Sequence, residues 1–103
     1  MDQAAESLIL DQLLSRLRGY FPELCERYGV STLGVFGSYV RGEQRAGSDL
    51  DLLVEFERVP TLLEFVDLQY HLSDLLGIKV DLVMKKALKP TIGCHILEEV
   101  VPV

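Results

Sequence analysis

The segment "SDLDLLVEF", Ser48 to Phe56, places two aspartates in a run that otherwise has the composition of a buried strand. Asp49 and Asp51 are two positions apart, so the pleat of a strand directs both carboxylates to one face and Leu50 and Leu52 to the other. The alternation then passes into a continuous apolar run, which is typical of a sheet covered on at least part of both faces. The segment therefore predicts a largely buried strand that holds two like charges side by side.

Glycine and proline divide the rest of the chain into helices and strands. The expected order is a helix over 7–17, a second short helix over 22–28 after Gly19, a strand over 31–37, a short helix or turn over 38–44, the strand over 48–56, a long helix over 61–77, a strand over 78–84 and a last helix over 90–100. The long helix is expected to bury an apolar stripe that includes Leu62, Phe65, Val66, Leu72 and Leu76. This order predicts an α/β (α+β) fold with a small central sheet and flanking helices.

The directions of the strands follow from the polar residues at their ends. If the turn at Gly37 and Ser38 and the aspartates Asp49, Asp51 and Asp81 share one site, that site lies at the end of the first strand and at the starts of the other two. The first strand then runs antiparallel to the second, and the second and third run parallel through a right-handed helical crossover. The sequence predicts a mixed sheet.

Length and composition limit the classes of protein to consider. With 103 residues, 49% of them apolar, the chain is expected to form a single domain over 1–103. No apolar stretch approaches the roughly 20 residues of a membrane span, and the first residues lack the pattern of a signal peptide, so we expect a cytoplasmic protein without a membrane partner. The net charge of -6 argues against nucleic acid as a partner. A small molecule or a protein is the expected partner.

The cysteines and histidines carry no recognisable chemistry. Cys25 and Cys94 are far apart, and His71 and His95 form no zinc pattern with them. Cys94 and His95 are neighbours in sequence, but catalytic Cys/His pairs are assembled by the fold and are seldom adjacent. We therefore expect reduced, structural cysteines.

Asp81 lies between Val80 and Leu82 in a third strand and adds another carboxylate to Asp49 and Asp51. Carboxylates held together repel, so they either raise their pKa values or gather cations. An all-carboxylate set without cysteine or histidine favours Mg²⁺ or Mn²⁺ over zinc or copper. Because Mg²⁺ usually shares its shell with substrate phosphates, the set points to a nucleotide, and two such ions can hold the attacking and leaving oxygens of a phosphoryl displacement.

The turn at Gly37 and Ser38 has two compatible interpretations. Gly37 supplies a tight bend, and Ser38 suits the N-cap of the helix that follows. The same glycine lets the backbone approach phosphate oxygens, which the serine hydroxyl and nearby amides can bind. Arg41, one turn further on, can add a fork of donors to the same phosphates.

The combination of Gly37-Ser38, Asp49-x-Asp51 and the strand-borne Asp81 resembles the DNA polymerase beta-like nucleotidyltransferase superfamily. Within it, the chain resembles the minimal nucleotidyltransferases, the MNT proteins of HEPN/MNT toxin-antitoxin pairs. The resemblance implies transfer of a nucleoside monophosphate from a triphosphate with release of pyrophosphate. It also implies that Asp49 and Asp51 hold two metal ions, that Asp81 helps to hold one of them, and that Gly37, Ser38 and Arg41 bind the triphosphate.

Family members of this size commonly add AMP from ATP to a tyrosine of a HEPN partner, which silences the RNase activity of that partner. The resemblance therefore implies an antitoxin with a HEPN-type partner that completes the acceptor site. A non-catalytic module that binds nucleotide and neutralises the partner by occlusion is the alternative. It is motivated by the small size of the chain and by the apolar tail "EEVVPV", which can either extend an interface or dock on its own core. Transfer to RNA or to a small molecule is a third interpretation. The acidic balance disfavours RNA unless the lysine cluster, Lys79, Lys85, Lys86 and Lys89, lines the approach of the acceptor.

Overall fold

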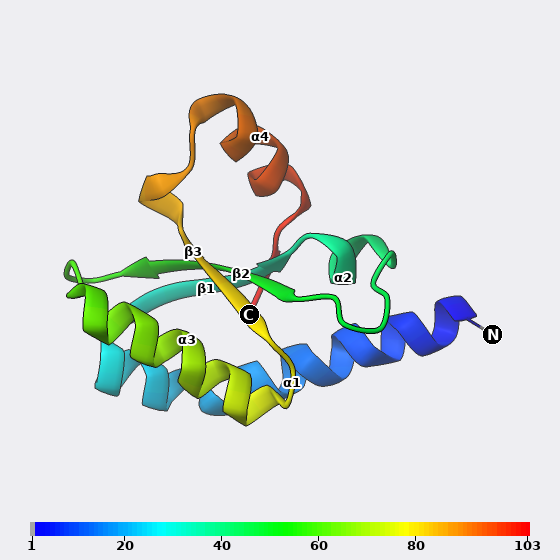
Figure 1. Ribbon diagram of the computed structural model, residues 1–103, viewed down its shortest axis with the longest axis horizontal. Coiled ribbons are helices and arrows are strands. Elements are labelled where there is room, and N and C mark those ends of the chain that lie inside the picture. Colours follow the sequence, from blue (N-terminus) through cyan, green and yellow to red (C-terminus); the bar gives the residue numbers. More distant parts are fainter. Residues whose placement is uncertain (1) are drawn as a thin grey trace.

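A computed structural model describes residues 2–103 of the chain, and the side chains of 9–91 and 93–103. The elements are α1 (Asp2–Tyr28), β1 (Val30–Phe36), α2 (Ser38–Arg41), β2 (Leu50–Phe56), α3 (Leu62–Leu76), β3 (Val80–Met84), a 3₁₀ turn (Lys85–Ala87), α4 (Pro90–Glu99) and β4 (Val101–Pro102). Figure 1 shows α1 and α3 on one face of the sheet and α4 on the other side. Among the described residues, no helix combines the length and the apolar composition that crossing a membrane requires.

The four strands form one mixed sheet in the order β3-β2-β1-β4. β1 is antiparallel to β2, and β2 is parallel to β3. These directions confirm the mixed sheet expected from the positions of the polar residues. The continuous apolar run of β2 is buried as expected, because Leu52, Leu53 and Val54 are at most 6% exposed and both faces of the strand are covered at this point.

The N-terminal region differs from the two short helices that the sequence suggests. α1 continues from Asp2 to Tyr28 through Gly19 and Pro22. Pro22 has no N–H for the helix ladder and costs about 3 kcal/mol inside a helix. Leu17 and Leu24, on either side of it, are both 0% exposed, and burial of two leucines contributes about 3–6 kcal/mol. Tertiary packing of one continuous apolar stripe therefore outweighs the local break.

α3 follows its expected bounds, but only part of its expected apolar stripe is buried. Thr61 and Glu64 form a reciprocal capping box at its start, and the left-handed Gly77 ends it. Leu68, Leu72 and Leu76, spaced one turn apart, are the buried residues of the helix. The helical residues Leu62 and Val66, which were expected on this stripe, are 76% and 37% exposed, because they lie to the side of the row that faces the sheet.

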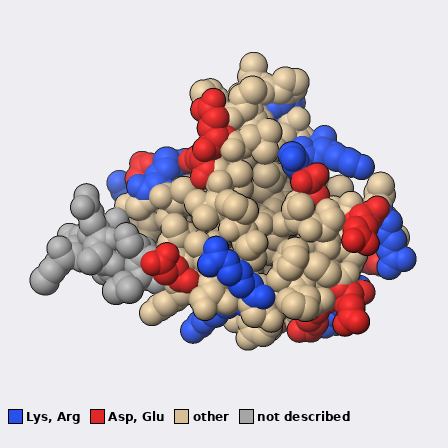
Figure 2. Space-filling model, turned by 180° about the vertical axis from the view of Figure 1, so that it is seen from behind, with Lys and Arg blue, Asp and Glu red and all other residues tan. Residues whose placement is uncertain are grey.

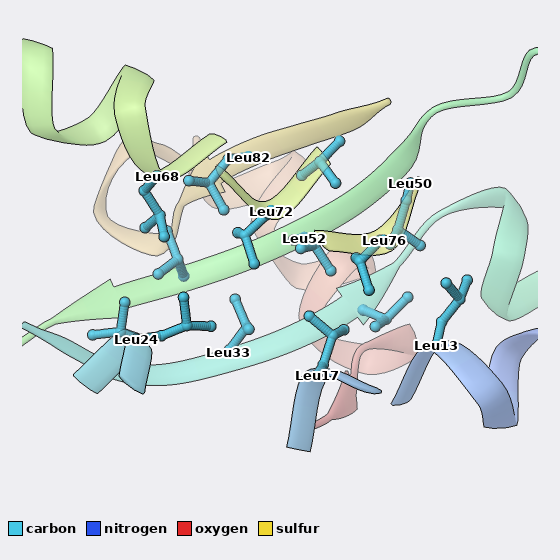
Figure 3. Close-up of a cluster of buried hydrophobic side chains, with 14 of the residues drawn as sticks. Leu13, Leu17, Leu24, Leu33, Leu50, Leu52, Leu68, Leu72, Leu76 and Leu82 are labelled. Carbon is cyan, nitrogen blue, oxygen red and sulfur yellow. The ribbon is translucent and has the colours of Figure 1, made fainter. Parts of the chain in front are cut away.

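The core lies between the two helices α1 and α3 and the sheet (Figure 3). Its fully buried leucines come from all three of these elements: Leu17 and Leu24 from α1, Leu50 and Leu52 from β2, and Leu68 and Leu72 from α3. Because side chains alternate along a strand, burial of Leu50 and Leu52 against the helices turns Asp51 to the opposite face. The core thus determines which face of the sheet carries the carboxylate.

The C-terminal tail forms a strand that the sequence did not indicate. β4 pairs antiparallel with β1, with Gly34 opposite Pro102 and Val35 opposite Val101. The Val103 N–H also donates to the Leu33 carbonyl at 2.9 Å. The tail therefore packs on its own sheet, which confirms one of the two interpretations of this segment.

Gly34 makes this packing possible, since a Cβ there would lie 2.5 Å from Val100 Cγ2 and 3.3 Å from the Val101 carbonyl oxygen. We expect Gly34→Ala to destabilise the fold by about 1–3 kcal/mol through overpacking. The measurement is the free energy of unfolding, together with faster hydrogen exchange of the Val103 amide. Gly19→Ala is the control, because a Cβ at Gly19 meets no atom within 4 Å. Equal stability of Gly34→Ala and the wild type would contradict the expectation.

Candidate active site

Gly37 connects β1 to α2 and packs directly against Asp51. Its backbone has φ 83° and ψ -153°, a region that essentially only glycine adopts. A Cβ at this position would overlap the Asp51 carboxylate. The preceding residue, Phe36, is the register partner of Asp51 on β2. The structure therefore brings together two of the residues that the sequence singles out, and it does so through the absence of a side chain at Gly37.

Ser38 does not have the capping role expected from the sequence. Gly37 occupies the N-cap position of α2, and Ser38 is the first helical residue. The Val40 and Arg41 amides donate to the Gly37 carbonyl at 3.1 and 3.2 Å, so the first turn of α2 closes on the glycine. The short helix ends at Arg41 with the left-handed Gly42, earlier than the expected range of 38–44. The Ser38 side chain, which is half-buried, makes no capping bond.

The three predicted aspartates gather around Asp51. Asp51 on β2 and Asp81 on β3 are register partners in the parallel pair, and Asp49 immediately precedes β2. The pKa of Asp51 is raised to about 6, first by burial and then by the neighbouring Asp81 and Asp49 carboxylates, against a smaller opposing effect of Arg41. The three carboxylates are therefore close enough for their charges to act on one another.

The outer two carboxylates are more accessible than Asp51. Asp81 is exposed, and Asp49 is half-buried with its Oδ2 3.9 Å from Lys79 Nζ. Within the described part of the chain, no set of three or more acidic, histidine or cysteine side chains is arranged closely enough to enclose a metal ion. The carboxylates nevertheless form an all-oxygen donor set. Burial is the main cause of the raised pKa of Asp51, and the Asp81 and Asp49 carboxylates add a repulsion that a hard cation would relieve. Their chemistry fits a divalent ion such as Mg²⁺.

Arg41 is held beside Gly37 by a glutamate that sequence reasoning missed. Arg41 Nη1 donates to both carboxylate oxygens of Glu99, at 2.9 and 3.0 Å, and Arg41 Nε donates to Glu43 Oε1 at 2.7 Å. Glu99 Oε2 also accepts a hydrogen bond from the Gly37 N–H at 3.1 Å. These bonds, first to Glu99 and then to Glu43, raise the pKa of Arg41. Glu99 lies 58 positions from Arg41, and no local pattern distinguishes it from Glu98.

The lysines do not form one surface toward the carboxylates. Lys79 lies near Asp49, whereas Lys85 Nζ pairs with Glu55 Oε1 at 3.4 Å. Figure 2 shows basic and acidic side chains interspersed over the face opposite the view of Figure 1. The cysteines are free, with Cys25 half-buried and Cys94 exposed, which agrees with the expectation of reduced cysteines.

The mixed sheet, the glycine turn and the clustered aspartates define a nucleotidyltransferase. The chain belongs to the nucleotidyltransferase domain family, whose model matches residues 17–101. Within this family it is a minimal nucleotidyltransferase. It is 42% identical to the chain of a solved structure described as a minimal nucleotidyltransferase, with a TM-score of 0.77 and coverage of 91% of this chain and 95% of that one. The resemblance, the fold class and the class of enzyme expected from the sequence are thereby confirmed.

The chain is also similar to one curated protein and to one further solved structure. Protein adenylyltransferase MntA of Thermococcus cleftensis is 52% identical over 94 residues, which are 91% of this chain and 95% of the relative. A solved complex of a tri-AMPylated Shewanella oneidensis HEPN toxin with its MNT antitoxin has a TM-score of 0.57 at 20% identity, covering 99% of this chain and 71% of that one. The second similarity establishes a shared fold.

Proposed function

We propose that this protein transfers AMP from ATP to a hydroxyl, expected to be that of a tyrosine, on a HEPN-type partner, and so acts as the antitoxin of that partner in the cytoplasm. The observation that carries the proposal is the contact of the Gly37 turn with Asp51, the carboxylate that Asp49 and Asp81 flank. This arrangement places a backbone that can approach phosphate beside a set of ligands for the cation that accompanies phosphate. The 52% identity to a protein adenylyltransferase supports a protein as the acceptor.

Each site residue has a role in this proposal. Asp49, Asp51 and Asp81 would hold Mg²⁺, with two ions expected and Mn²⁺ as an alternative. The bound ions would supply neutralisation of phosphate charge and a lower pKa for the acceptor hydroxyl. The Gly37 N–H and the Ser38 hydroxyl would bind oxygens of the triphosphate, and the Arg41 guanidinium would add a fork of donors.

These contacts would orient the α-phosphate toward the acceptor. The acceptor oxygen forms a bond to the α-phosphorus as the bond from that phosphorus to the bridging oxygen breaks, and pyrophosphate leaves. The acceptor proton passes to solvent or to a carboxylate of the site. Asp51, with a pKa of about 6, is mainly ionised at pH 7 and is then in the form that binds a cation. Catalysis in this class rests on positioning and on stabilisation of charge.

The test uses the purified protein, its HEPN partner, Mg²⁺ and radiolabelled ATP. We expect label from α-³²P-ATP on the partner and none from γ-³²P-ATP, because the β- and γ-phosphates leave as pyrophosphate. Replacement of the acceptor tyrosine of the partner by phenylalanine should remove the label. A folded preparation that transfers no label from any α-labelled nucleotide would count against the proposal.

The alternative of a non-catalytic module that acts by occlusion was motivated by the small size of the chain and by the apolar tail. The second motive is weaker, because Val101 and Pro102 pair with β1. The two functions differ in whether neutralisation of the partner requires the carboxylates, and the Asp51 variant discussed below separates them.

A further inference from the structure

The Glu99 carboxylate lies on the groups that the proposed function assigns to the triphosphate. Its two oxygens accept three hydrogen bonds, one from the Gly37 N–H at 3.1 Å and two from Arg41 Nη1 at 2.9 and 3.0 Å. A carboxylate is planar and a phosphate is tetrahedral, but both carry anionic oxygens that accept hydrogen bonds from the same backbone and guanidinium donors. The chain therefore places an anion of its own on donors that a nucleotide needs.

We propose that Glu99 is an internal competitor of the nucleotide, which must displace this carboxylate before its phosphates reach Gly37 and Arg41. The inference rests on the proposed function and adds a control of nucleotide affinity to it. The apparent affinity of a ligand falls by the fraction of molecules in which its site is open. Removal of the Glu99 charge should therefore tighten nucleotide binding.

The C-terminal segment holds Glu99 in this position. Glu99 is the last residue of α4, and β4, which starts two residues later, pairs with β1 at Gly34 and Val35. Val100 packs over Gly34, so the end of α4 lies against the same strand that leads into Gly37. The Glu99 side chain is only 23% exposed, compared with 63% for Glu43, the other partner of Arg41. Glu99 is thus positioned by a paired strand, whereas Glu43 lies in an exposed loop.

Displacement of Glu99 leaves the rest of the site in place. Arg41 keeps its hydrogen bond to Glu43 at 2.7 Å, and the Gly37 turn remains fixed by the bonds from Val40 and Arg41 to its carbonyl. The Glu99 carboxylate also adds to the negative charge around Asp51. A bound triphosphate would repel it, so a rotation of this side chain toward solvent both frees the donors and removes the repulsion.

The experiment measures binding of α,β-methylene-ATP with Mg²⁺ by titration calorimetry, since the α–β bridge of this analogue is not cleaved. We expect Glu99→Gln to bind about three- to tenfold more tightly than the wild type, as expected for loss of a partly exposed charged competitor. Glu98→Gln is the matched control, because Glu98 is an exposed neighbour with the same charge on the same helix. Its affinity should equal that of the wild type.

Unchanged or weaker binding by Glu99→Gln would overturn the inference and indicate that Glu99 only positions Arg41. Equal tightening by Glu98→Gln would also overturn it, because the effect would then come from net charge. Glu99→Ala is measured as a second variant, so that the inference can still be tested if one of the two variants does not fold. If the wild type binds the analogue and transfers AMP, but neither Glu99 variant binds the analogue more tightly, this inference alone is contradicted. No binding by any of the proteins contradicts the proposed function and the inference together.

Discussion

Asp51→Asn is expected to reduce AMP transfer by about a hundred- to a thousandfold, the loss typical of removing one group that stabilises charge in a transition state. Asp51 is the carboxylate against which Gly37 packs and which Asp81 and Asp49 flank. Its replacement by the isosteric amide removes the central charge and leaves the shape of the turn. The measurement is the initial rate of label transfer from α-³²P-ATP to the partner, with Asp74→Asn, an exposed change on α3, as the control.

The same variant should be more stable than the wild type in the absence of metal. Because the pKa of Asp51 is raised from 3.8 to about 6, the folded state binds more protons than the unfolded state between these values. The free energy of unfolding therefore falls as the pH rises from about 4 to about 6, and the loss persists above that range. After a discount for solvent screening of this partly exposed group, we expect Asp51→Asn to gain about 1 kcal/mol at pH 7 and almost nothing at pH 4.

Unfolding in EDTA at pH 4 and pH 7 measures this difference. A variant that is less stable than the wild type at pH 7 would contradict the burial and the clustering of charge that raise the pKa of Asp51. Neutralisation of the partner is measured on the same preparation. If Asp51→Asn transfers no AMP and still neutralises the partner fully, occlusion rather than catalysis is the mechanism.

Gly37→Ala is expected to lower AMP transfer by about a hundredfold or more, because a displacement of about 1 Å in a reactive geometry costs this much. The new Cβ would overlap the Asp51 carboxylate, and alanine does not readily adopt the φ of 83°. The turn or the carboxylate must move, and both belong to the proposed site. We also expect a loss of about 1–3 kcal/mol in stability from the backbone strain.

Gly47→Ala is the control that separates backbone strain at a positive φ from the overlap of a new Cβ with a neighbouring side chain. Gly47 has a φ of 86°, but a Cβ there meets no atom within 4 Å. This variant should share the loss of stability and retain transfer. Equal rates for Gly37→Ala and the wild type, measured well below the melting temperature of each, would show that close approach of the turn to Asp51 is not required.

Local signals in the sequence predicted most of the fold. The range of 61–77 expected for α3 is correct, because its start at Thr61 and its end at Gly77 depend on residues close to the helix ends. The break expected between two N-terminal helices was wrong, since packing of Leu17 and Leu24 across Pro22 is a tertiary effect. β4 has only two residues, which are too few for a periodic pattern, so no sequence pattern indicates its pairing with β1.

The candidate site was predictable to the extent that it depends on strand geometry. The parallel crossover brought Asp81 opposite Asp51, as the strand directions predict. Asp49 was expected in the same strand, but β2 begins one residue later, at Leu50. The N-cap was placed at Ser38 instead of Gly37, because a difference of one residue depends on backbone angles that composition does not fix. Glu99 was missed because its contacts depend on the course of the chain after α4. The roles of the predicted residues in binding metal and nucleotide stay predictions.

The parallel pairing of β2 with β3 has a consequence for how the site can vary. The register that sets Asp51 opposite Asp81 also sets Leu50 opposite Val80 and Leu52 opposite Leu82, and these four apolar residues are at most 4% exposed. A slip of one residue would turn a carboxylate into the core, so apolar burial fixes the spacing of the charges. Burial of Leu50, Leu52, Val80 and Leu82 therefore fixes the register that sets Asp51 opposite Asp81. Changes in core volume, far from any substrate, should alter the distance between Asp51 and Asp81 before they unfold the chain.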